Sequence, residues 1–325
     1  MAPKSGHPDP PSWMEPQLAT LTHEPFSGPD WVFERKLDGE RCLAFAGPDG
    51  VRLKSRTKHD VTTTFPEIAS ALTAQRHGDF VADGEIVAFD GAQTRFGRLQ
   101  QRLGVVQPSQ QLLDDFPVYY YLFDVLYADG EFTRELPLRE RKELLAGLMD
   151  FHDPLRFTEH RERDGEAFYT QACHDGWEGL IAKRADAPYQ GYRTRDWLKL
   201  KCENAQEFVI GGYTDPQRSR VGFGALLLGY YDPGGDLVYA GKVGTGFDTR
   251  TLRGLHASLA RLERASAPFK KGHLPSPRGV HWVTPKLVGQ VAFTEWTDDG
   301  QLRHPRFQGL RDDKEPRDVS RELPA

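Results

Sequence analysis

The segment that most restricts the fold is the stretch of residues 31–41, where apolar and polar side chains alternate up to an Asp38-Gly39 pair. Alternation predicts a strand, and an Asp-Gly pair predicts the turn that ends it. Lys36 then lies near the strand end, on the same side as Glu34. A deprotonated lysine can attack the α-phosphorus of a nucleotide and hold the nucleotidyl group as a phosphoramidate, provided that nearby cations and a metal lower its pKa. The alternative is a surface lysine in a hairpin turn.

Hydrophobic periodicity predicts a mixed first half with mainly antiparallel strands. Apolar spacing indicates helices over residues 65–75, 96–103 and 138–148, the last from Leu138, Leu144, Leu145 and Leu148. Further strands are expected over residues 42–45, 51–54, 80–89 and 118–126. The predicted class is α+β.

The second half changes character after Cys202. Short strands are expected over residues 207–212, 224–231, 237–243, 280–283 and 288–296, with a helix over residues 249–264. This spacing is typical of a small barrel. A chain of 325 residues favours two domains. We expect a flexible, proline-rich lead-in over residues 1–17, a first domain over residues 18–203 and a second over residues 204–325.

Composition excludes several classes of protein. No stretch has the length and apolar character of a membrane span, and the amino terminus has no apolar signal core. A cytoplasmic protein is therefore expected. Cys42, Cys173 and Cys202 show no C-x-x-C spacing, which predicts reduced thiols and neither a disulfide framework nor a zinc site. With a net charge of −5, nucleic-acid contacts would have to come from local basic patches.

Two pairs of charged residues have the spacing of functional groups. Asp83 and Glu85 lie two residues apart in an apolar strand, so both carboxylates share one face and could hold magnesium or a ribose. Lys199 and Lys201 share one face of another strand, which suits a triphosphate. An exposed strand end for the acids, and a solvated strand face for the lysines, are the alternatives.

Two further segments are candidates. Glu178 and Lys183 stand at the two ends of an otherwise apolar strand, where charges need partners or a metal. Phe123 follows three tyrosines and could form a platform for a base, although a phenylalanine in the core is the more common outcome.

Taken together and in order, these segments resemble the covalent nucleotidyltransferases, which comprise the ATP-dependent DNA ligases, RNA ligases and mRNA capping enzymes. The motifs that carry the resemblance are Lys36-Leu37-Asp38-Gly39-Glu40-Arg41, Ser55-Arg56, Asp83-Gly84-Glu85, Phe123-Asp124, Glu178-Gly179 and Lys199-Leu200-Lys201. A narrower similarity is to the ligase domain of bacterial non-homologous end-joining ligases. It lies in residues 18–21, 219–231, 239–247, 295–297, 303–305 and 309–314. The likeness covers residues 17–315.

The resemblance implies a nucleotidyltransferase domain followed by an OB-fold domain, and a three-step reaction. Lys36 attacks ATP, the AMP passes to a 5′-phosphate on nicked or broken duplex DNA, and the neighbouring 3′-hydroxyl displaces it. By the same resemblance, Glu34 reads the adenine amino group and Phe123 stacks on the ring. The other nucleotide-binding residues that it implies are Arg41, Arg56, Glu85, Lys183, Lys199 and Lys201.

The resemblance also implies a magnesium ion, with manganese as an alternative. The implied ligands are the four acids Asp38, Asp83, Glu85 and Glu178. Lys199 and Lys201 would neutralise the α-phosphate. Arg311 and Lys314 belong to the last motif, which orients the leaving pyrophosphate when the OB-fold domain closes over ATP.

The implied partners are a Ku homodimer and a separately encoded repair polymerase, which would recruit a stand-alone, monomeric ligase to breaks. Two positions depart from the family pattern. Gly289-Gln290 stands where an acid is expected, and Glu40 where relatives often have an aromatic residue. The alternatives are an RNA ligase, a capping-type nucleotidyltransferase and a non-catalytic OB-fold protein that binds nucleic acid.

Overall fold

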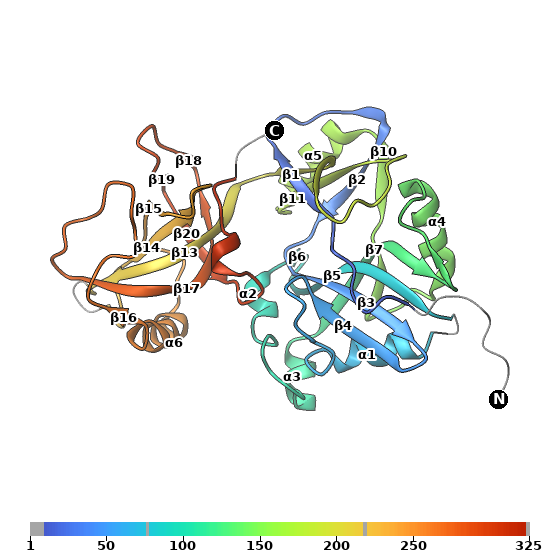
Figure 1. Cartoon of the computed structure of the whole chain (residues 1–325), viewed down its shortest axis with the longest axis horizontal. Coiled ribbons are helices and arrows are strands. Elements are labelled where there is room, and N and C mark those ends of the chain that lie inside the picture. Colours follow the sequence, from blue (N-terminus) through green and yellow to red (C-terminus); the bar gives the residue numbers. More distant parts are fainter. Residues whose placement is uncertain (1–9, 76–77, 217–219, 323–325) are drawn as a thin grey trace. The chain divides into compact units, whose positions relative to one another are not determined.

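The computed structural model describes residues 10–75, 78–216 and 220–322, and the chain divides into two compact units between Cys202 and Glu203 (Figure 1). The sequence placed this boundary one residue later. Each unit has its own apolar core.

The first unit contains two sheets. The five-stranded sheet has the order β1 (Leu18–Thr22), β12 (Arg193–Lys201), β11 (Gly179–Arg184), β2 (Gly28–Lys36) and β10 (His160–Arg163). The seven-stranded sheet has the order β4 (Gly50–Ser55), β3 (Glu40–Gly47), β5 (Phe80–Asp90), β7 (Val118–Ala128) and β8 (Glu131–Phe132), with β6 (Gln93–Thr94) beside β5 and β9 (Leu155–Phe157) beside β7. Pairing is antiparallel except between β1 and β12 and between β7 and β9.

The chain crosses from one sheet to the other at the Asp38-Gly39 turn, between β2 and β3. The predicted strand end and turn are therefore confirmed. Gly39 passes so close to β5 that a Cβ atom would lie 2.2 Å from the carbonyl oxygen of Ile86. Only glycine fits there, because a side chain would force the crossover away from β5.

Among the described residues of this unit, five helices pack around these sheets. They are α1 (Pro66–Thr73), α2 (Phe96–Leu99), α3 (Gln110–Asp115), α4 (Leu138–Leu148) and α5 (Gly165–His174). Helix α4 has the predicted bounds and α2 is shorter than predicted, while α3 and α5 were not predicted. No helix in the described residues has the length and apolar character needed to cross a membrane.

Residues 10–17 correct one expectation. Met14 and Gln17 are buried, and the Gln17 side chain accepts a hydrogen bond from the backbone N–H of Gln190. The backbone N–H of Gln17 also donates to the hydroxyl of Tyr189. The prediction of a flexible lead-in is wrong for this part, and residues 1–9 lie outside the described residues.

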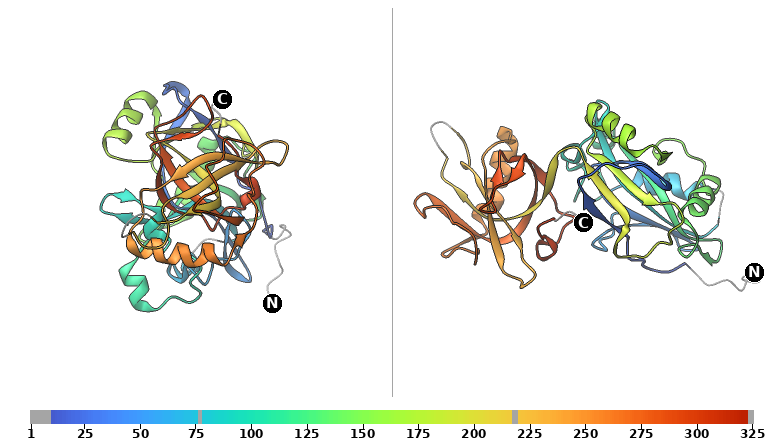
Figure 2. Two further views of the ribbon diagram at one scale, coloured as in Figure 1. Left: turned by 90° about the vertical axis from the view of Figure 1, so that its left-hand side faces the viewer. Right: turned by 90° about the horizontal axis from the view of Figure 1, so that it is seen from above.

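The second unit is built on a curled antiparallel sheet with the order β15 (Leu237–Val243), β14 (Leu226–Tyr231), β13 (Asn204–Thr214), β17 (Val280–Phe293) and β16 (Glu263–Arg264), with β20 (Arg306–Leu310) also beside β17. Helix α6 (Thr249–Ala260) lies beside this sheet (Figure 2), and its Leu252, Leu255 and Leu259 belong to the apolar core of the unit. A small two-stranded sheet, β18 (Glu295–Trp296) and β19 (Leu302–Arg303), and a 3₁₀ turn, η1 (Pro316–Asp318), complete the unit.

Strand β17 joins two predicted strands into one. It continues through Pro285, which the sequence analysis placed between them. The register against β13 shifts between Ile210 and Gly212, so the proline falls at an irregularity. A residue without a backbone N–H is tolerated in a sheet at such a site.

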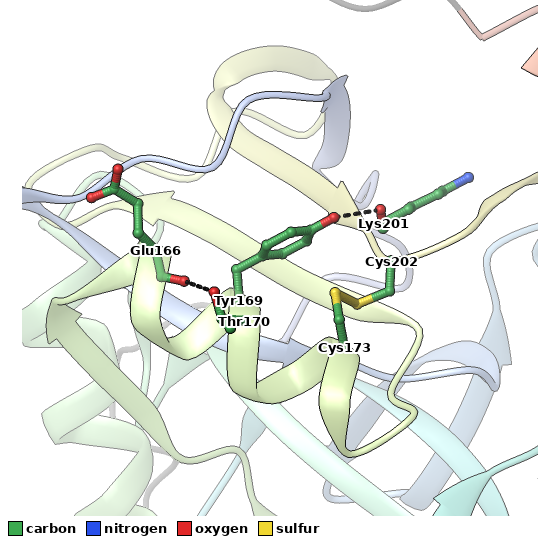
Figure 3. Close-up of a disulfide and its surroundings, with 6 residues drawn as sticks. All are labelled: Glu166, Tyr169, Thr170, Cys173, Lys201 and Cys202. Carbon is green, nitrogen blue, oxygen red and sulfur yellow. Dashed lines mark hydrogen bonds between the residues drawn. A yellow bond between two sulfur atoms is a disulfide. The ribbon is translucent and has the colours of Figure 1, made fainter.

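The cysteines correct a second expectation. Cys173, at the end of α5, forms a disulfide with Cys202, which directly follows β12, and their Cα atoms are 5.2 Å apart (Figure 3). The hydroxyl of Tyr169 donates to the carbonyl of Lys201 beside this bridge. Spacing along the chain could not reveal the pair, because α5 and β12 become neighbours only in the folded unit. Cys42 is buried and is not disulfide-bonded.

We expect Cys173→Ser to lower the free energy of unfolding by about 3 kcal/mol, because a bridge across 29 residues restricts the unfolded chain. Chemical denaturation of the oxidised variant and wild type measures the difference, which should vanish in a thiol reductant. Alkylation of the unreduced, unfolded wild type should modify Cys42 alone. Modification of all three cysteines would contradict the pairing.

Candidate active site

One face of the five-stranded sheet brings Lys36 and the lysine pair into register. Lys36 of β2 pairs with Gly179 of β11, which pairs in turn with Lys201 of β12. Glu34 and Lys199 occupy the next row on the same face. Two strand spacings separate Lys36 from Lys201, or about 10 Å. Each predicted pair, Glu34 with Lys36 and Lys199 with Lys201, thus shares a face, and the sheet places both pairs on the same face.

Gly179 lies in the middle of the first row. Its φ of 146° is in the region that favours glycine, and a Cβ atom would lie 1.9 Å from the carbonyl oxygen of Leu200. The row therefore has no side chain between Lys36 and Lys201. The long side chains of Lys36 and Lys201 can therefore extend their amino groups toward a phosphate placed over Gly179.

Lys36 forms an ion pair with Glu178, with Nζ 2.7 Å from Oε2. Burial acts to lower the pKa of Lys36, but Glu178, with smaller contributions from Glu85 and Asp38, raises it above its ordinary value. The sequence analysis expected nearby cations to lower the pKa of Lys36, whereas these acidic neighbours raise it. Lys36 is an ammonium in this arrangement and must lose a proton before it can attack.

Arg41 and Asp83 form a bidentate ion pair on the facing sheet, with both N···O distances 2.6 Å. The Asp83 side chain is fully buried and also accepts a hydrogen bond from the hydroxyl of Tyr189. Burial acts to lower the pKa of Arg41, but Asp83, with smaller contributions from Tyr189 and Glu85, raises it above its ordinary value. Asp83 holds Arg41 in place, which differs from the predicted role of metal ligand.

The four predicted metal ligands do not form one cluster. Across the residues that the structure describes, no three His, Cys, Asp or Glu side chains are grouped to hold a metal. Asp38 accepts a hydrogen bond from the backbone N–H of Phe96 at the start of α2. Glu85 and Glu178 both act on the Lys36 ammonium. These two carboxylates fit magnesium, which proteins commonly hold by one or two carboxylates together with substrate phosphates.

Glu34 is buried, and its carboxylate lies between two lysines. Its Oε1 is 2.7 Å from Nζ of Lys142, on α4, and its Oε2 is 2.6 Å from Nζ of Lys183, on β11. Phe123 lies beside Lys183, whose ammonium is 4.2 Å from its ring centre, and packs against Trp197 in a T-shaped arrangement. An acceptor, a donor and a ring are thus adjacent, as recognition of a purine requires.

Lys183 is more acidic than an ordinary lysine. Burial, opposed by Glu34 and reinforced by the charge of Lys142, lowers its pKa to about 8. Its side chain is 2% exposed. A perturbed, buried group of this kind beside an aromatic ring is more typical of a functional site than of a surface.

The predicted closing residues are paired within the second unit. Arg311 makes two hydrogen bonds of 2.8 Å to Asp313, and Lys314 lies 3.0 Å from Glu207. The Arg311 side chain is largely buried. Sequence reasoning assigned no role to either acid: Asp313 lies in the same segment, 309–314, and Glu207 lies on the distant strand β13.

Three other positions are placed as follows. Arg56 follows β4 and is half-buried, and within the described residues its side chain forms no ion pair. Gln290 is buried on β17, where its Oε1 lacks a hydrogen-bond partner among those residues. Glu40 is buried at the start of β3. Ser219, in a segment that carries the resemblance, lies outside the described residues.

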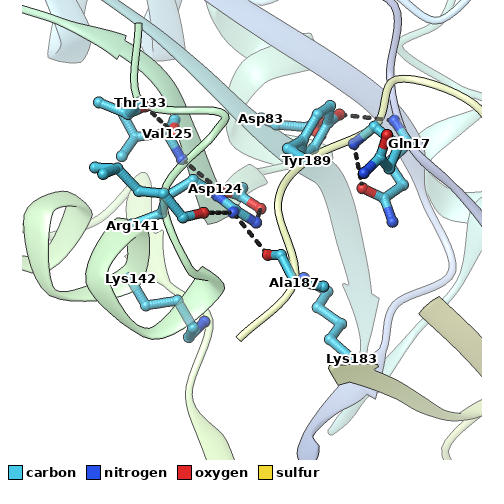
Figure 4. Close-up of polar contacts among 12 residues, drawn as sticks. Gln17, Asp83, Asp124, Val125, Thr133, Arg141, Lys142, Lys183, Ala187 and Tyr189 are labelled. Atoms are coloured by element: carbon cyan, nitrogen blue, oxygen red, sulfur yellow. Dashed lines mark hydrogen bonds and ion pairs between the residues drawn. The ribbon is translucent and has the colours of Figure 1, made fainter. Parts of the chain in front are cut away.

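Helix α4 holds two charged residues that sequence reasoning missed. Arg141 forms a fully buried bidentate pair with Asp124 (Figure 4), and Lys142 holds Glu34. Their positions, three and four residues after Leu138, place them on the buried face. That spacing was the available signal, whereas Leu144, counted among the apolar residues of the helix, is 44% exposed.

Comparisons with known proteins agree with this arrangement. Residues 16–201 match the model of the ATP dependent DNA ligase domain, and residues 219–314 match that of the ATP dependent DNA ligase C terminal region. The chain is 38% identical to the multifunctional non-homologous end joining protein LigD of Pseudomonas aeruginosa, over 99% of this chain and 38% of LigD. It is 30% identical to a DNA ligase of Thermococcus onnurineus, over 90% of this chain and 53% of that protein.

Among solved structures, a mycobacterial DNA ligase D complexed with ATP and MES is similar, with a TM-score of 0.68 and 36% identity over 95% of this chain and 98% of that one. Nucleotidyltransferase and OB-fold domains in this order, and the α+β class, are confirmed. The chain spans about two fifths of the length of the LigD proteins that it matches.

Proposed function

This chain belongs to the ATP-dependent DNA ligases, and we propose that it seals 5′-phosphate/3′-hydroxyl breaks in duplex DNA through AMP carried on Lys36. The observation that supports this most is the position of Lys36, which ends β2 against Glu178 and shares a row with Lys201. A nucleophile, an acid beside it and cations across an open row form the set that nucleotidyl transfer needs.

In the first step, Nζ of Lys36 forms a bond to the α-phosphorus of ATP and the bond to pyrophosphate breaks. Glu178, 2.7 Å from Nζ, is placed to take the proton that Lys36 must lose. Lys199 and Lys201 balance the charge on the α-phosphate. A magnesium ion held by Glu85 and Glu178 would supply charge neutralisation at the phosphates. Glu34, Lys183 and Phe123 bind the adenine.

In the later steps, the 5′-phosphate of the DNA attacks the lysyl-AMP and releases Lys36, and the 3′-hydroxyl then displaces AMP as the phosphodiester forms. Arg41 is held on the facing sheet by Asp83 and the Gln17 carbonyl through Nε and Nη2, which leaves Nη1 to donate to a phosphate. We assign Arg41, assisted by Arg56, to the 5′-phosphate.

Arg311→Ala and Lys314→Ala should each slow self-adenylylation by about 100-fold, as expected for loss of one charged group at a transferring phosphate. Sealing of DNA that already carries a 5′-adenylate should change by less than about threefold, because no pyrophosphate leaves in that step. Single-turnover rates of the two reactions provide the comparison. Arg264→Ala, which removes an exposed arginine hydrogen-bonded to Ser266, is the matched control. Equal losses in both reactions would disprove the closing role.

We further propose that the substrate is a DNA break joined by non-homologous end joining, with a Ku homodimer and a separate repair polymerase as partners of a monomeric ligase in the cytoplasm. The support is the identity with LigD proteins along nearly the whole chain. Magnesium is the proposed metal, and manganese the alternative.

Incubation of the full chain with labelled ATP or GTP, magnesium, and nicked or blunt-ended DNA tests the function. We expect covalent label from ATP alone, and sealing of the nick with loss of that label. Sealing of blunt ends should increase when Ku is added. Label from GTP alone would indicate a capping-type enzyme, sealing of RNA alone an RNA ligase, and no label from either nucleotide a non-catalytic protein.

A further inference from the structure

The carboxylate of Glu34 is held by two lysines, and only one of them, Lys183, is among the nucleotide-binding residues that the family resemblance implies. Lys183, near the end of β11, contacts one oxygen, and Lys142, from α4, contacts the other. Glu34 and Lys142 are each 2% exposed. Water therefore does little to stabilise the negative charge of this carboxylate, and the two lysines stabilise it instead.

The ammonium of Lys142 is fixed from three sides. It lies 2.7 Å from Glu34 and donates to the carbonyl of Thr158 at 3.1 Å, and the ring of Phe157 is centred 4.7 Å away. An ammonium has three N–H groups, so these contacts occupy it. Lys142 is a fixed support for Glu34, whereas Lys183 faces the rings of Phe123 and Trp197 and is the lysine that can meet a base.

The charge of Glu34 decides which purine it can bind. An ionised carboxylate only accepts hydrogen bonds, so it suits the 6-amino group of adenine and repels the 6-oxo group of guanine. A buried carboxyl without enough cations takes up a proton and becomes a donor, which suits the 6-oxo group. Burial acts to raise the pKa of Glu34, but Lys142 and Lys183 together lower it below its ordinary value.

We propose that Lys142 is a positioning residue for nucleotide selection, which keeps Glu34 ionised and oriented as the acceptor that distinguishes 6-aminopurine from 6-oxopurine triphosphates. Lys142 acts through Glu34 and touches neither the nucleotide nor the reacting atoms. The inference rests on the proposed function, because it needs a nucleotide bound beside Phe123.

The test compares covalent labelling of the full chain by ATP and by GTP, as the ratio of the two kcat/KM values. Lys142→Met should lower the preference for ATP by about tenfold or more, the size expected when a buried polar contact to a substrate group is lost. Lys142→Arg, which keeps the charge, should recover most of it. An unchanged preference in Lys142→Met would overturn the proposal. If that variant does not fold, Lys142→Gln, which keeps a donor without the charge, is measured instead.

Two controls separate positioning from general loss of stability. Arg102→Met removes another fully buried cation, paired with Glu67. It should lower the melting temperature yet leave the preference for ATP unchanged, and an equal fall in preference would overturn the proposal. In a Glu34→Gln background, Lys142→Met should have no further effect on the ratio, and an additive effect would also overturn it. A wild-type chain that takes no label from ATP would instead refute the proposed function itself.

Discussion

Lys36→Ala is expected to abolish self-adenylylation, with a fall of at least about 1,000-fold in its rate, because no other group can form the phosphoramidate at this position. The same variant should still seal nicked DNA that carries a preformed 5′-adenylate, since the 3′-hydroxyl is the nucleophile there. Gel assays with labelled ATP, and with pre-adenylated DNA, measure the two activities separately.

The matched control is Lys271→Ala, which removes an exposed lysine paired with Asp232 in the second unit. It should match wild type in both assays. Covalent labelling of Lys36→Ala by ATP would show that another residue is the nucleophile. Loss of both activities together with a lowered melting temperature would mean that Lys36 is needed mainly for folding.

Asp83→Asn is expected to destabilise the first unit by about 3 kcal/mol, because breaking a buried ion pair leaves Arg41 without its counter-charge. Sealing of a pre-adenylated nick should also fall, since the guanidinium loses its fixed orientation. Chemical denaturation and single-turnover sealing measure the two effects. Asp186→Asn, which removes the exposed partner of Arg139, should change stability by less than about 1 kcal/mol.

Magnesium titration decides between the two roles considered for Asp83. If Asp83 only holds Arg41, the magnesium concentration for half-maximal self-adenylylation should be the same in Asp83→Asn and wild type. Glu85→Gln should require more magnesium. A large shift for Asp83→Asn, relieved by excess metal, would restore Asp83 to the metal site.

Local sequence was a good guide wherever a single segment determined the structure. The alternation before Asp38-Gly39 predicted the strand and turn that carry Lys36, and the spacing of Lys199 and Lys201 predicted their shared face. These features depend on strand periodicity and turn chemistry, which act over a few residues.

Relations between distant segments were beyond such reasoning. The disulfide of Cys173 with Cys202 and the pairing of Glu34 with Lys142 join elements that become neighbours only after folding. Nothing in the sequence indicated the role of Lys142, because a lysine in a helix is usually exposed to solvent. This lysine is instead buried beside the carboxylate of Glu34, whose charge it neutralises. Asp83 shows the same limit: its spacing from Glu85 suggested a shared metal, and the structure pairs it with Arg41.

The most direct measurement of the central claim is the site of attachment of AMP. After incubation with ATP and magnesium, proteolysis and mass spectrometry of the wild-type chain should find one adenylyl group, on the peptide that contains Lys36, with fragmentation placing it on that lysine. Addition of nicked DNA should remove it as the nick is sealed. An adenylyl group on Lys199, Lys201 or any other residue, or none at all, would contradict the account.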